Sequence, residues 1–329
     1  MRFLIAGLGS IGRRHLRNLL SLGKQDIILY RTYHSTLPED ELAGFPVETD
    51  LRAALEYRPN AVIISNPTAL HLDVAIPAAE MGCHLLLEKP VSHSFEQVDE
   101  LRTAVQRGGG QVLVGFQFRF HPTLQVAAGL IADGAIGRPI SARAHWGEYL
   151  PNWHPWEDYR QGYAARTDLG GGVILTLCHP LDYMRWLMGE VESLWALTSA
   201  TEKLDIPVEN TVEIGLRFAS GAIGSVHLDY VQQPTVHHIE IIGSEGTLRW
   251  NDDDGVLSLY STSSKTWKTW TPSESFERNQ MFLDEMRHFL AMARREIQPA
   301  CSLEDGIRVL EIALLARASA ADGMQKVLA

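Results

Sequence analysis

The sequence predicts an α/β protein in two parts: a doubly wound parallel sheet at the N-terminus, then an α+β part with a large, mostly antiparallel open sheet. Three observations support this prediction. Short apolar runs alternate with helical patterns in the first part of the chain, a glycine-rich turn follows the first run, and two-residue alternation dominates beyond residue 139. Alternating strands and helices indicate βαβ units, whereas two-residue alternation indicates strands with one buried face.

The first part contains apolar runs of strand length, separated by segments with helical spacing. The runs lie at 3–6, 27–30, 61–65, 83–87 and 112–116, and the helical segments at 13–22, 50–57, 68–81 and 94–107. Strands in such a succession form a parallel sheet that binds its ligand at the carboxyl ends of the strands. We therefore assign residues 1–118 to a ligand-binding domain.

The second part, residues 119–329, follows a different pattern. Strands are predicted at 140–146, 194–199, 212–218, 222–230, 236–242 and 256–260, and helices at 122–133, 172–187, 276–297 and 303–322. Turn residues such as Ala219-Ser220-Gly221 separate successive strands. This part is expected to form a second domain around a mostly antiparallel sheet.

Composition limits the classes of partner. With 45% apolar and 21% charged residues, the 329-residue chain is typical of a globular protein of about two domains. Its formal net charge of −11 argues against nucleic acid, whose binding depends on Lys and Arg at phosphates. Cys83, Cys178 and Cys301 have no paired spacing, so we expect no disulfide, no metal site and a cytoplasmic location. No apolar run reaches the length of a membrane span, so no membrane contact is expected.

The glycine-rich turn Gly7-Leu8-Gly9-Ser10-Ile11-Gly12 directly follows the run 3–6. Between a strand and a helix, such a turn presents backbone N–H groups, including those of Ser10 and Ile11, to a pyrophosphate. The alternative is a turn that only packs a helix on a sheet, which would not need glycine at all three positions, Gly7, Gly9 and Gly12. The context favours a Rossmann domain that binds a nicotinamide dinucleotide.

Arg31 follows the second predicted strand, where an acidic residue would bind the adenine ribose of NAD. Arginine there favours the 2′-phosphate of NADP, so NADP is the preferred cofactor and NAD the alternative. A solvated surface arginine is the other interpretation. Ser65, Asn66 and Pro67 leave the third long strand in a turn that we expect to border the cofactor. His71 is grouped with them, although a structural role in the following helix explains it more simply.

Glu88-Lys89-Pro90 directly follows the run 83–87, so Lys89 lies at the carboxyl end of a later strand of the same sheet. Its ammonium is able to bind a substrate oxygen, stabilise a developing alkoxide and exchange a proton with it. Glu88 is expected to hold Lys89 in place beside the cofactor, and a cis Lys89–Pro90 bond is compatible with a tight strand exit. The alternative is a charged surface turn.

These strings resemble the Gfo/Idh/MocA family of oxidoreductases across almost the whole chain. The further matching strings are Asn66-Pro67-Thr68-x-x-His71 and Gly170-Gly171-Gly172 followed by His179-Pro180-Leu181-Asp182. The resemblance implies pyranose or cyclitol substrates and assembly as a homodimer or homotetramer through the antiparallel sheet. It also implies that Lys89 and His179 are catalytic, transferring the hydroxyl proton and orienting the substrate, while Asp182 orients His179 or makes a structural hydrogen bond.

One departure from the family pattern concerns the residues before His179. Family members commonly carry an aspartate three or four residues earlier, where this chain has Thr176 and Leu175. Neither side chain is able to act as a carboxylate base, which leaves a Lys89/His179 pair or a chain without efficient catalysis. Thr176, Asp182, Lys89 and His179 remain candidate substrate contacts.

The segment 145–166 is rich in aromatic and hydrogen-bonding side chains, which suits a sugar ring. We assign substrate binding to His154, Tyr159 and Arg160, because a polar substrate needs hydrogen bonds. The aromatic residues could equally pack a long loop onto the sheet. Gln117 and Arg119 follow the last strand of the first part, and we assign Gln117 to the cofactor and Arg119 to the substrate.

The sequence thus predicts an NAD(P)-dependent oxidoreductase that moves a hydride between nicotinamide and a hydroxyl or ketone carbon of a sugar, sugar acid, cyclitol or nucleotide sugar. A non-catalytic dinucleotide-binding sensor is the alternative from another class. A third interpretation is an enzyme that holds its cofactor tightly and cycles between two sugars. The missing carboxylate before His179 favours the sensor, and the presence of both Lys89 and His179 favours an enzyme.

Overall fold

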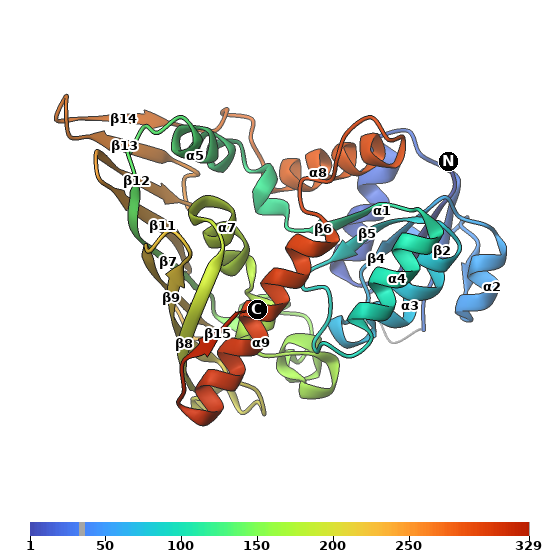
Figure 1. Ribbon diagram of the computed structural model, residues 1–329. Coiled ribbons are helices and arrows are strands. Elements are labelled where there is room, and N and C mark those ends of the chain that lie inside the picture. Colours follow the sequence, from blue (N-terminus) through green and yellow to red (C-terminus); the bar gives the residue numbers. More distant parts are fainter. Residues whose placement is uncertain (33–36, 329) are drawn as a thin grey trace. The chain divides into compact units, whose positions relative to one another are not determined.

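The computed structural model describes residues 1–32 and 37–328, which form two compact units (Figure 1). The first unit comprises Met1–Gln117, Asp168–Gly170 and Arg278–Ile307. The second comprises Phe118–Thr167, Gly171–Glu277 and the residues from Arg308 onward. The single boundary predicted between residues 118 and 119 is therefore incomplete, since the chain returns to the first unit twice.

The first unit contains the predicted parallel sheet, with the strand order β3-β2-β1-β4-β5-β6. Its strands are β1 (Phe3–Ala6), β2 (Ile27–Tyr30), β3 (Val47–Glu48), β4 (Ala61–Ile64), β5 (His84–Glu88) and β6 (Val112–Gly115). β3 was not predicted, because a two-residue strand shows no periodicity. The strand order reverses direction between β1 and β4, and ligands of such sheets bind at the carboxyl ends of the strands beside this point.

Helices of the first unit explain why residues 278–307 belong to it. They are α1 (Ser10–Ser21), α2 (Leu51–Glu56), α3 (His71–Glu80), α4 (Val98–Gly108) and α8 (Arg278–Ala293). α3 packs on α4, and α1 packs on α8. Asn279 donates a hydrogen bond to Asn18 over 3.0 Å, and the Arg14 guanidinium lies 4.4 Å from the centre of the Phe282 ring. Helix α8 is thus part of the first core, although strands of the second unit precede it in the sequence.

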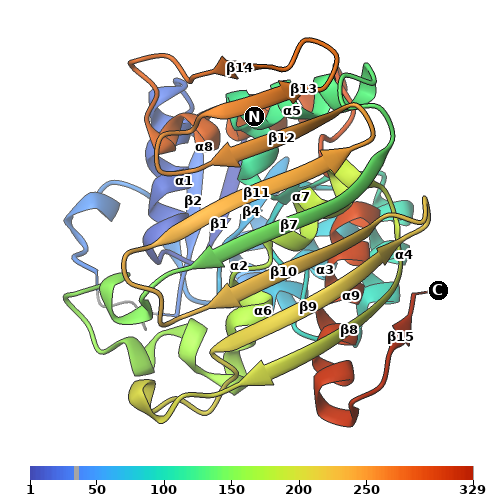
Figure 2. The same ribbon diagram turned by 90° about the vertical axis from the view of Figure 1, so that its left-hand side faces the viewer.

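The second unit is built on a nine-stranded sheet with the order β14-β13-β12-β11-β7-β10-β9-β8-β15 (Figure 2). The strands are β7 (Pro139–Gly147), β8 (Val191–Ser199), β9 (Thr211–Phe218), β10 (Ile223–Asp229), β11 (Val236–Gly243), β12 (Gly246–Asn251), β13 (Leu257–Ser261), β14 (Thr266–Trp270) and β15 (Lys326–Val327). Only the β7–β10 pair among these is parallel, so the predicted mostly antiparallel sheet is confirmed. β14 and β15 were not predicted, since β14 is an exposed edge strand and β15 has two residues.

The second unit contains α5 (Pro122–Ala132), α6 (Val173–Thr176) and α7 (His179–Met188). Helix α9 (Leu303–Asp322) begins in the first unit and continues into the second from Arg308. The single helix predicted over 172–187 is wrong, because α6 and α7 are separate. Pro180 has no N–H group to donate to the carbonyl of Thr176, so a continuous helix would lose a hydrogen bond there. The break starts a new helix at His179.

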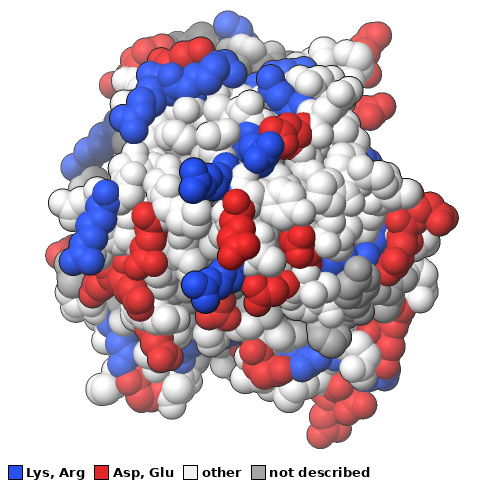
Figure 3. Space-filling model, turned by 90° about the vertical axis from the view of Figure 1, so that its right-hand side faces the viewer, with Lys and Arg blue, Asp and Glu red and all other residues white. Residues whose placement is uncertain are grey.

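Three further properties complete the description. None of the helices in the described ranges is both long and apolar enough to cross a lipid bilayer. On the face drawn in Figure 3, Lys and Arg are interspersed with Asp and Glu among uncharged residues. The cysteines Cys83, Cys178 and Cys301 are buried, and no disulfide joins them within the described residues.

Candidate active site

Two glycines of the N-terminal turn are required for packing. Gly7 has φ +86°, in the left-handed region, and a Cβ added to it would lie 2.4 Å from the backbone nitrogen of Asn66. A Cβ on Gly12 would lie 1.9 Å from the carbonyl oxygen of Gly7. Neither position tolerates a side chain, because backbone already fills the space. These two glycines bring α1 and the turn after β4 close to the end of β1.

Gly9 differs from both neighbours. It is exposed, its φ of −71° is ordinary, and a Cβ built on it would meet no atom of the described residues within 4 Å. It lies at the N-terminus of α1, where the N–H groups of the first turn have no partner within the helix. Open space over uncovered backbone N–H groups, including those of Ser10 and Ile11, fits the pyrophosphate of a dinucleotide.

The turns after β4 and β5 lie at the same edge of the parallel sheet. Ser65 donates its hydroxyl to the carbonyls of Ala6 and Gly7, over 3.0 and 2.9 Å. Asn66 donates to the carbonyl of Leu70 over 2.7 Å and closes the turn through Pro67. The structure therefore places Ser65 and Asn66 against Gly7, and contact of the Ser65–Pro67 turn with a cofactor stays a prediction.

His71 links the two turns from inside the protein. Its Nδ1 lies 2.9 Å from the carbonyl oxygen of Pro90, and its Nε2 lies 3.0 Å from that of Asn66. Burial lowers the pKa of this imidazole, although the charge of Glu88 acts in the opposite direction. His71 therefore contacts the backbone of both turns, which is a positioning role.

Lys89 directly follows β5, is half-buried, and is joined to Pro90 by a cis peptide bond. Glu88 is buried and accepts a hydrogen bond of 2.7 Å at its Oε1 from Nε2 of His15. The carboxyl ends of β1, β4 and β5 meet at one edge, because these strands are parallel neighbours. The predicted Lys89 position beside the cofactor turn is therefore consistent with the geometry of the first unit. Gln117, the last residue of this segment, is also buried.

Glu88 belongs to a buried cluster of titratable side chains that the sequence analysis did not predict. One donor atom each of His15, Glu88 and Glu285 lies within 4.8 Å of the others, and all three side chains are buried. Neither oxygen of Glu285 has a hydrogen-bond partner among the described residues. Burial, with the charge of Glu88, raises the pKa of Glu285 well above its ordinary value. Burial opposes ionisation of Glu88 as well, but the hydrogen bond and charge of His15, together with the charges of Lys89 and His71, outweigh it and lower the pKa of Glu88.

The sequence indicates the place of His15 in this cluster but not that of Glu285. His15 is three residues after Gly12, and residues at that spacing share a helix face, so it was predictable that His15 faces the sheet. Glu285 is brought to the cluster by the packing of α8 on α1. No local pattern announces such a contact.

Arg31 is not a solvated surface residue. Its side chain is buried, and Nη2 lies 3.2 Å from Oε1 of Glu39. Its backbone N–H donates to the carbonyl of Glu48 over 3.1 Å, which holds the end of β2 against β3. A phosphate at this position would therefore compete with the Glu39 carboxylate for the guanidinium.

In the second unit, His179 begins α7 and is surrounded by aromatic rings. Its ring centre lies 5.1 Å from that of Phe118 and 5.5 Å from that of Trp146. His237 of β11 stacks on Trp146, with ring centres 4.3 Å apart, and its ring centre lies 4.8 Å from that of Phe118. This packing fixes the imidazole of His179 in a buried setting. The aromatic neighbours were not predicted, because they come from separate elements.

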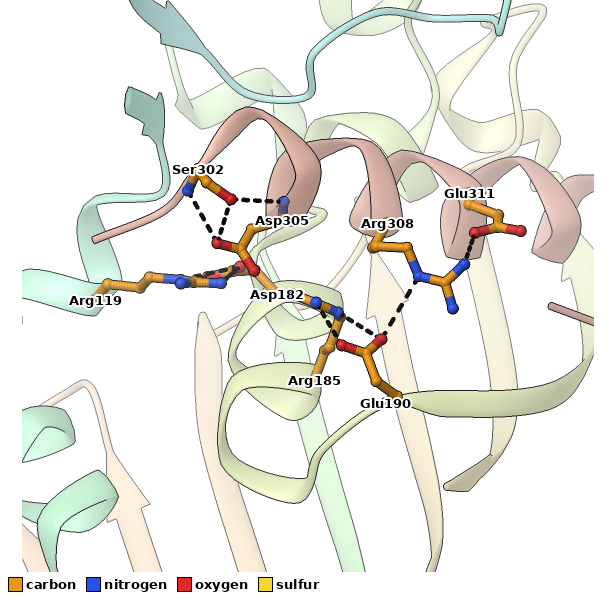
Figure 4. A network of polar contacts seen from close by, with 8 residues as sticks. All are labelled: Arg119, Asp182, Arg185, Glu190, Ser302, Asp305, Arg308 and Glu311. Atoms are coloured by element: carbon orange, nitrogen blue, oxygen red, sulfur yellow. Dashed lines mark hydrogen bonds and ion pairs between the residues drawn. The ribbon is translucent and has the colours of Figure 1, made fainter. Parts of the chain in front are cut away.

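Asp182 and Arg119, both predicted substrate contacts, bind each other (Figure 4). The Arg119 Nη2 and Nε atoms lie 2.7 and 3.0 Å from the carboxylate oxygens, and both side chains are buried. Thr176 is buried as well. The structure therefore gives Arg119 and Asp182 a partner within the protein, and substrate binding by all three residues stays a prediction.

The predicted sugar-binding loop residues also have local partners. Tyr159 donates its hydroxyl to the carbonyl of Leu204 over 2.8 Å. Arg160 is exposed, lies 3.1 Å from Asp158 and has its guanidinium 4.8 Å from the centre of the Tyr159 ring. The His154 ring centre lies 5.1 Å from that of Trp156. Substrate binding by this loop stays a prediction.

Comparison with known protein families agrees with these two units. Residues 1–116 match the oxidoreductase family with an NAD-binding Rossmann fold, and residues 124–249 match the Gfo/Idh/MocA C-terminal domain. The chain belongs to the Gfo/Idh/MocA family. The family resemblance predicted from the sequence is thereby confirmed, as is the NAD-binding Rossmann fold.

Three similar proteins illustrate the family. The 1,5-anhydro-D-fructose reductase of Ensifer adhaerens is 27% identical over 80% of this chain and 78% of its own length. The myo-inositol 2-dehydrogenase of Thermotoga maritima is 27% identical over 97% of this chain and 96% of its own. The solved structure of a levoglucosan dehydrogenase in complex with NADH superposes with a TM-score of 0.90 at 22% identity, covering 100% of this chain and 99% of that one. The last likeness supports the fold.

Proposed function

We propose that this protein is an NAD(P)-dependent oxidoreductase that acts on a hydroxyl or ketone carbon of a cyclic sugar or cyclitol. The observation that carries the proposal is the open space over Gly9 between two packed glycines, at the N-terminus of α1. The same unit holds Lys89 at the carboxyl end of β5, beside the turn of Ser65 and Asn66. Both features belong to the segment that matches the NAD-binding family.

The chain's own residues account for binding and for the proton. The backbone N–H groups of Ser10 and Ile11 would hold the pyrophosphate, with the Ser65–Pro67 turn beside it. When bound, nicotinamide supplies or accepts the hydride. Lys89 would bind the substrate oxygen and exchange its proton, and His179 is the residue of the second unit proposed to orient a substrate hydroxyl. Aromatic packing around His179 restricts its ring, which favours an orienting role.

The substrate class rests on the relatives. They are named for 1,5-anhydro-D-fructose and myo-inositol, and the superposed structure for levoglucosan. All three are cyclic and rich in hydroxyl groups. Such substrates need hydrogen-bonding side chains, and His154, Tyr159 and Arg160 are the candidates proposed for them.

A substrate screen tests the proposal. The purified protein would be mixed with NAD or NADP and a panel of cyclic sugars and cyclitols, while the absorbance of reduced nicotinamide is followed. On the best substrate, Lys89→Ala and His179→Ala should each lower kcat/KM by about 10²–10⁴-fold, the usual contribution of a positioned acid or base. Lys24→Ala is the matched control for removal of a lysine. Wild-type rates in both site variants would refute the assignment of these residues.

A second candidate function is a dinucleotide-binding sensor. It is favoured by Thr176 and Leu175, which are buried at the positions where the family resemblance implies a carboxylate. A sensor would bind the dinucleotide with ordinary affinity but leave its oxidation state unchanged with every sugar. Release of cofactor from the purified protein on denaturation would instead favour a cofactor that stays bound between two half-reactions.

Preference for NADP over NAD is proposed from Arg31 alone. Arg31→Asp should shift the ratio of affinities toward NAD by about tenfold, equivalent to about 1.4 kcal/mol. The ion pair with Glu39 makes a second variant informative, because Glu39→Gln removes a carboxylate that would compete with the 2′-phosphate and should raise NADP affinity. Unchanged ratios in both variants would remove Arg31 from the cofactor site.

We further propose a cytoplasmic homo-oligomer. Exposed apolar side chains on the second sheet support assembly, among them Trp195, Leu197 and Ile223, at 47%, 63% and 55% exposure. Light scattering during size exclusion would measure the mass. Leu197→Lys should shift it toward the monomer if this face is the interface.

A further inference from the structure

Three histidines lie next to one another across the nine-stranded sheet. In the strand register, His227 of β10 pairs with His145 of β7, and His145 pairs with His238 of β11. Successive residues of a strand point to opposite faces of a sheet. Trp146 and His237 stack together on the face that α7 covers, so His145 and His238 lie on the other face. This row was invisible in the sequence, because its members come from three strands.

Asp229 supplies a carboxylate to the same face. It lies two residues after His227, and its Oδ2 is 3.4 Å from Nε2 of His227 and 3.7 Å from Nε2 of His145. Its other oxygen, Oδ1, accepts the backbone N–H groups of Val231 and Gln232 over 2.8 and 2.6 Å. One oxygen is thus held by backbone, while the other is directed at two imidazoles.

Gly147 makes room for this arrangement. It pairs with Asp229 across the β7–β10 ladder. A Cβ at position 147 would lie 2.3 Å from Oδ2 of Asp229 and would displace the carboxylate. The absence of a side chain on Gly147 therefore lets Oδ2 lie between the two histidines.

We propose that His145, His227 and Asp229 form a zinc-binding site. One donor atom of each lies within 4.8 Å of the other two. A tetrahedral zinc with ligands at about 2.0–2.1 Å places its ligand atoms roughly 3.3–3.5 Å apart. The distances of 3.4 and 3.7 Å from Asp229 to the two imidazoles match this spacing, so small side-chain movements suffice.

The donor set favours zinc among common ions. Two imidazoles and one carboxylate suit Zn²⁺, whereas Mg²⁺ prefers oxygen ligands and water. His238, whose ring centre lies 5.5 Å from that of His145, is close enough to supply a fourth ligand, and water is the other choice.

Glu213 supports the site from behind His227. The two residues pair across β9 and β10, and Oε2 of Glu213 lies 2.9 Å from Nδ1 of His227. A carboxylate that accepts from Nδ1 fixes the ring and leaves Nε2 as the metal ligand. Metal-binding histidines commonly have such a hydrogen-bond partner on the nitrogen that does not bind the metal.

Calorimetric titration of the chelator-treated full-length protein with ZnCl₂ tests the proposal. The wild type should bind one Zn²⁺ per chain with a Kd of about 1 µM or lower, and MgCl₂ should give no binding. His145→Ala/His227→Ala should abolish this binding. Glu213→Gln should weaken it by about 10–100-fold, as expected for a residue that orients a ligand. His84→Ala, which removes a half-buried histidine of the first unit, should bind as the wild type does.

Thermal unfolding gives a second readout that separates loss of the site from loss of the fold. Zinc should raise the Tm of the wild type and of His84→Ala, because a ligand of the folded state stabilises it. Gly147→Ala keeps both histidines but displaces Asp229, and it should lose most of the zinc affinity. The proposal is overturned if the wild type binds no zinc, or if the double histidine variant binds it as tightly as the wild type.

Discussion

The glycine turn of the first unit is formed mainly by backbone atoms, whereas the surroundings of His179 in the second unit are formed mainly by side chains. In the turn, backbone fills the space at Gly7 and Gly12 and is left uncovered at Gly9. Around His179, aromatic side chains pack on the ring, and Asp182 on the same helix is held by Arg119. A site made of backbone is damaged by added atoms, whereas a site made of side chains is damaged by their removal. The two regions should therefore respond to opposite kinds of substitution.

The largest effect is expected at Gly12, with Gly9 as its matched comparison. Gly12→Val should destabilise the protein by about 3 kcal/mol or more, because its Cβ would lie 1.9 Å from the Gly7 carbonyl oxygen. Gly9→Val should leave the free energy of unfolding almost unchanged, since its Cβ meets open space. It should nevertheless lower dinucleotide affinity by about 100-fold, by covering the backbone N–H groups.

Urea unfolding and cofactor titration of both variants provide the measurement. The distinction between packing glycines and a binding glycine fails if Gly9→Val binds the dinucleotide normally. It fails equally if Gly12→Val is as stable as the wild type.

Removal of Asp182 tests the side-chain region. Asp182→Leu should cost about 3–5 kcal/mol, since it leaves the buried guanidinium of Arg119 without its carboxylate. The double variant Asp182→Leu/Arg119→Met should regain much of that loss, because apolar pairs often replace buried ion pairs well. A double-mutant cycle by urea unfolding measures the coupling, and additive losses would contradict it.

The variant Glu285→Gln tests the buried carboxylate of the first unit through the pH dependence of its Tm. The pKa of Glu285 is raised above 4.5 in the folded protein, so its stabilising contribution is complete below that value. The contribution is lost as the pH rises toward the folded-state pKa, because the folded protein then holds a proton that the unfolded chain has released. The amide is neutral throughout, so the Tm of Glu285→Gln relative to wild type should rise as the pH increases above 4.5.

Exposed Glu274→Gln is the control for this profile and should follow the wild type at every pH. A Glu285→Gln difference that stays constant with pH would show that Glu285 is ionised in the folded protein.

The smallest effect is expected at Tyr159. Tyr159→Phe removes the hydrogen bond to the carbonyl of Leu204 and should cost about 1 kcal/mol of stability. If this contact is the main role of the hydroxyl, KM for the best substrate should change less than about threefold. A tenfold rise in KM with unchanged stability would instead assign the hydroxyl to the substrate.

The sequence predicted the parts that depend on strand ends. Gly9, Ser65 and Lys89 each follow an apolar run, and the carboxyl ends of parallel strands meet at one edge, so their grouping needed no tertiary information. Glu285 and the partnership of Arg119 with Asp182 were not predictable, because packing between elements distant in the sequence creates them. The break between α6 and α7 was partly predictable. Pro180 indicates a helix start, but the helical pattern on both sides of it led to the prediction of one continuous helix.

The position of residues 278–307 in the sequence affects the order in which the first unit is able to fold during translation. Strand β1 leaves the ribosome early, yet α8, which packs on α1, follows the whole antiparallel sheet along the chain. During translation, the surface of α1 that packs on α8 therefore stays exposed until most of the polypeptide has been synthesised. Truncation before residue 278 would leave that surface permanently exposed and deprive the buried His15–Glu88 pair of its cover.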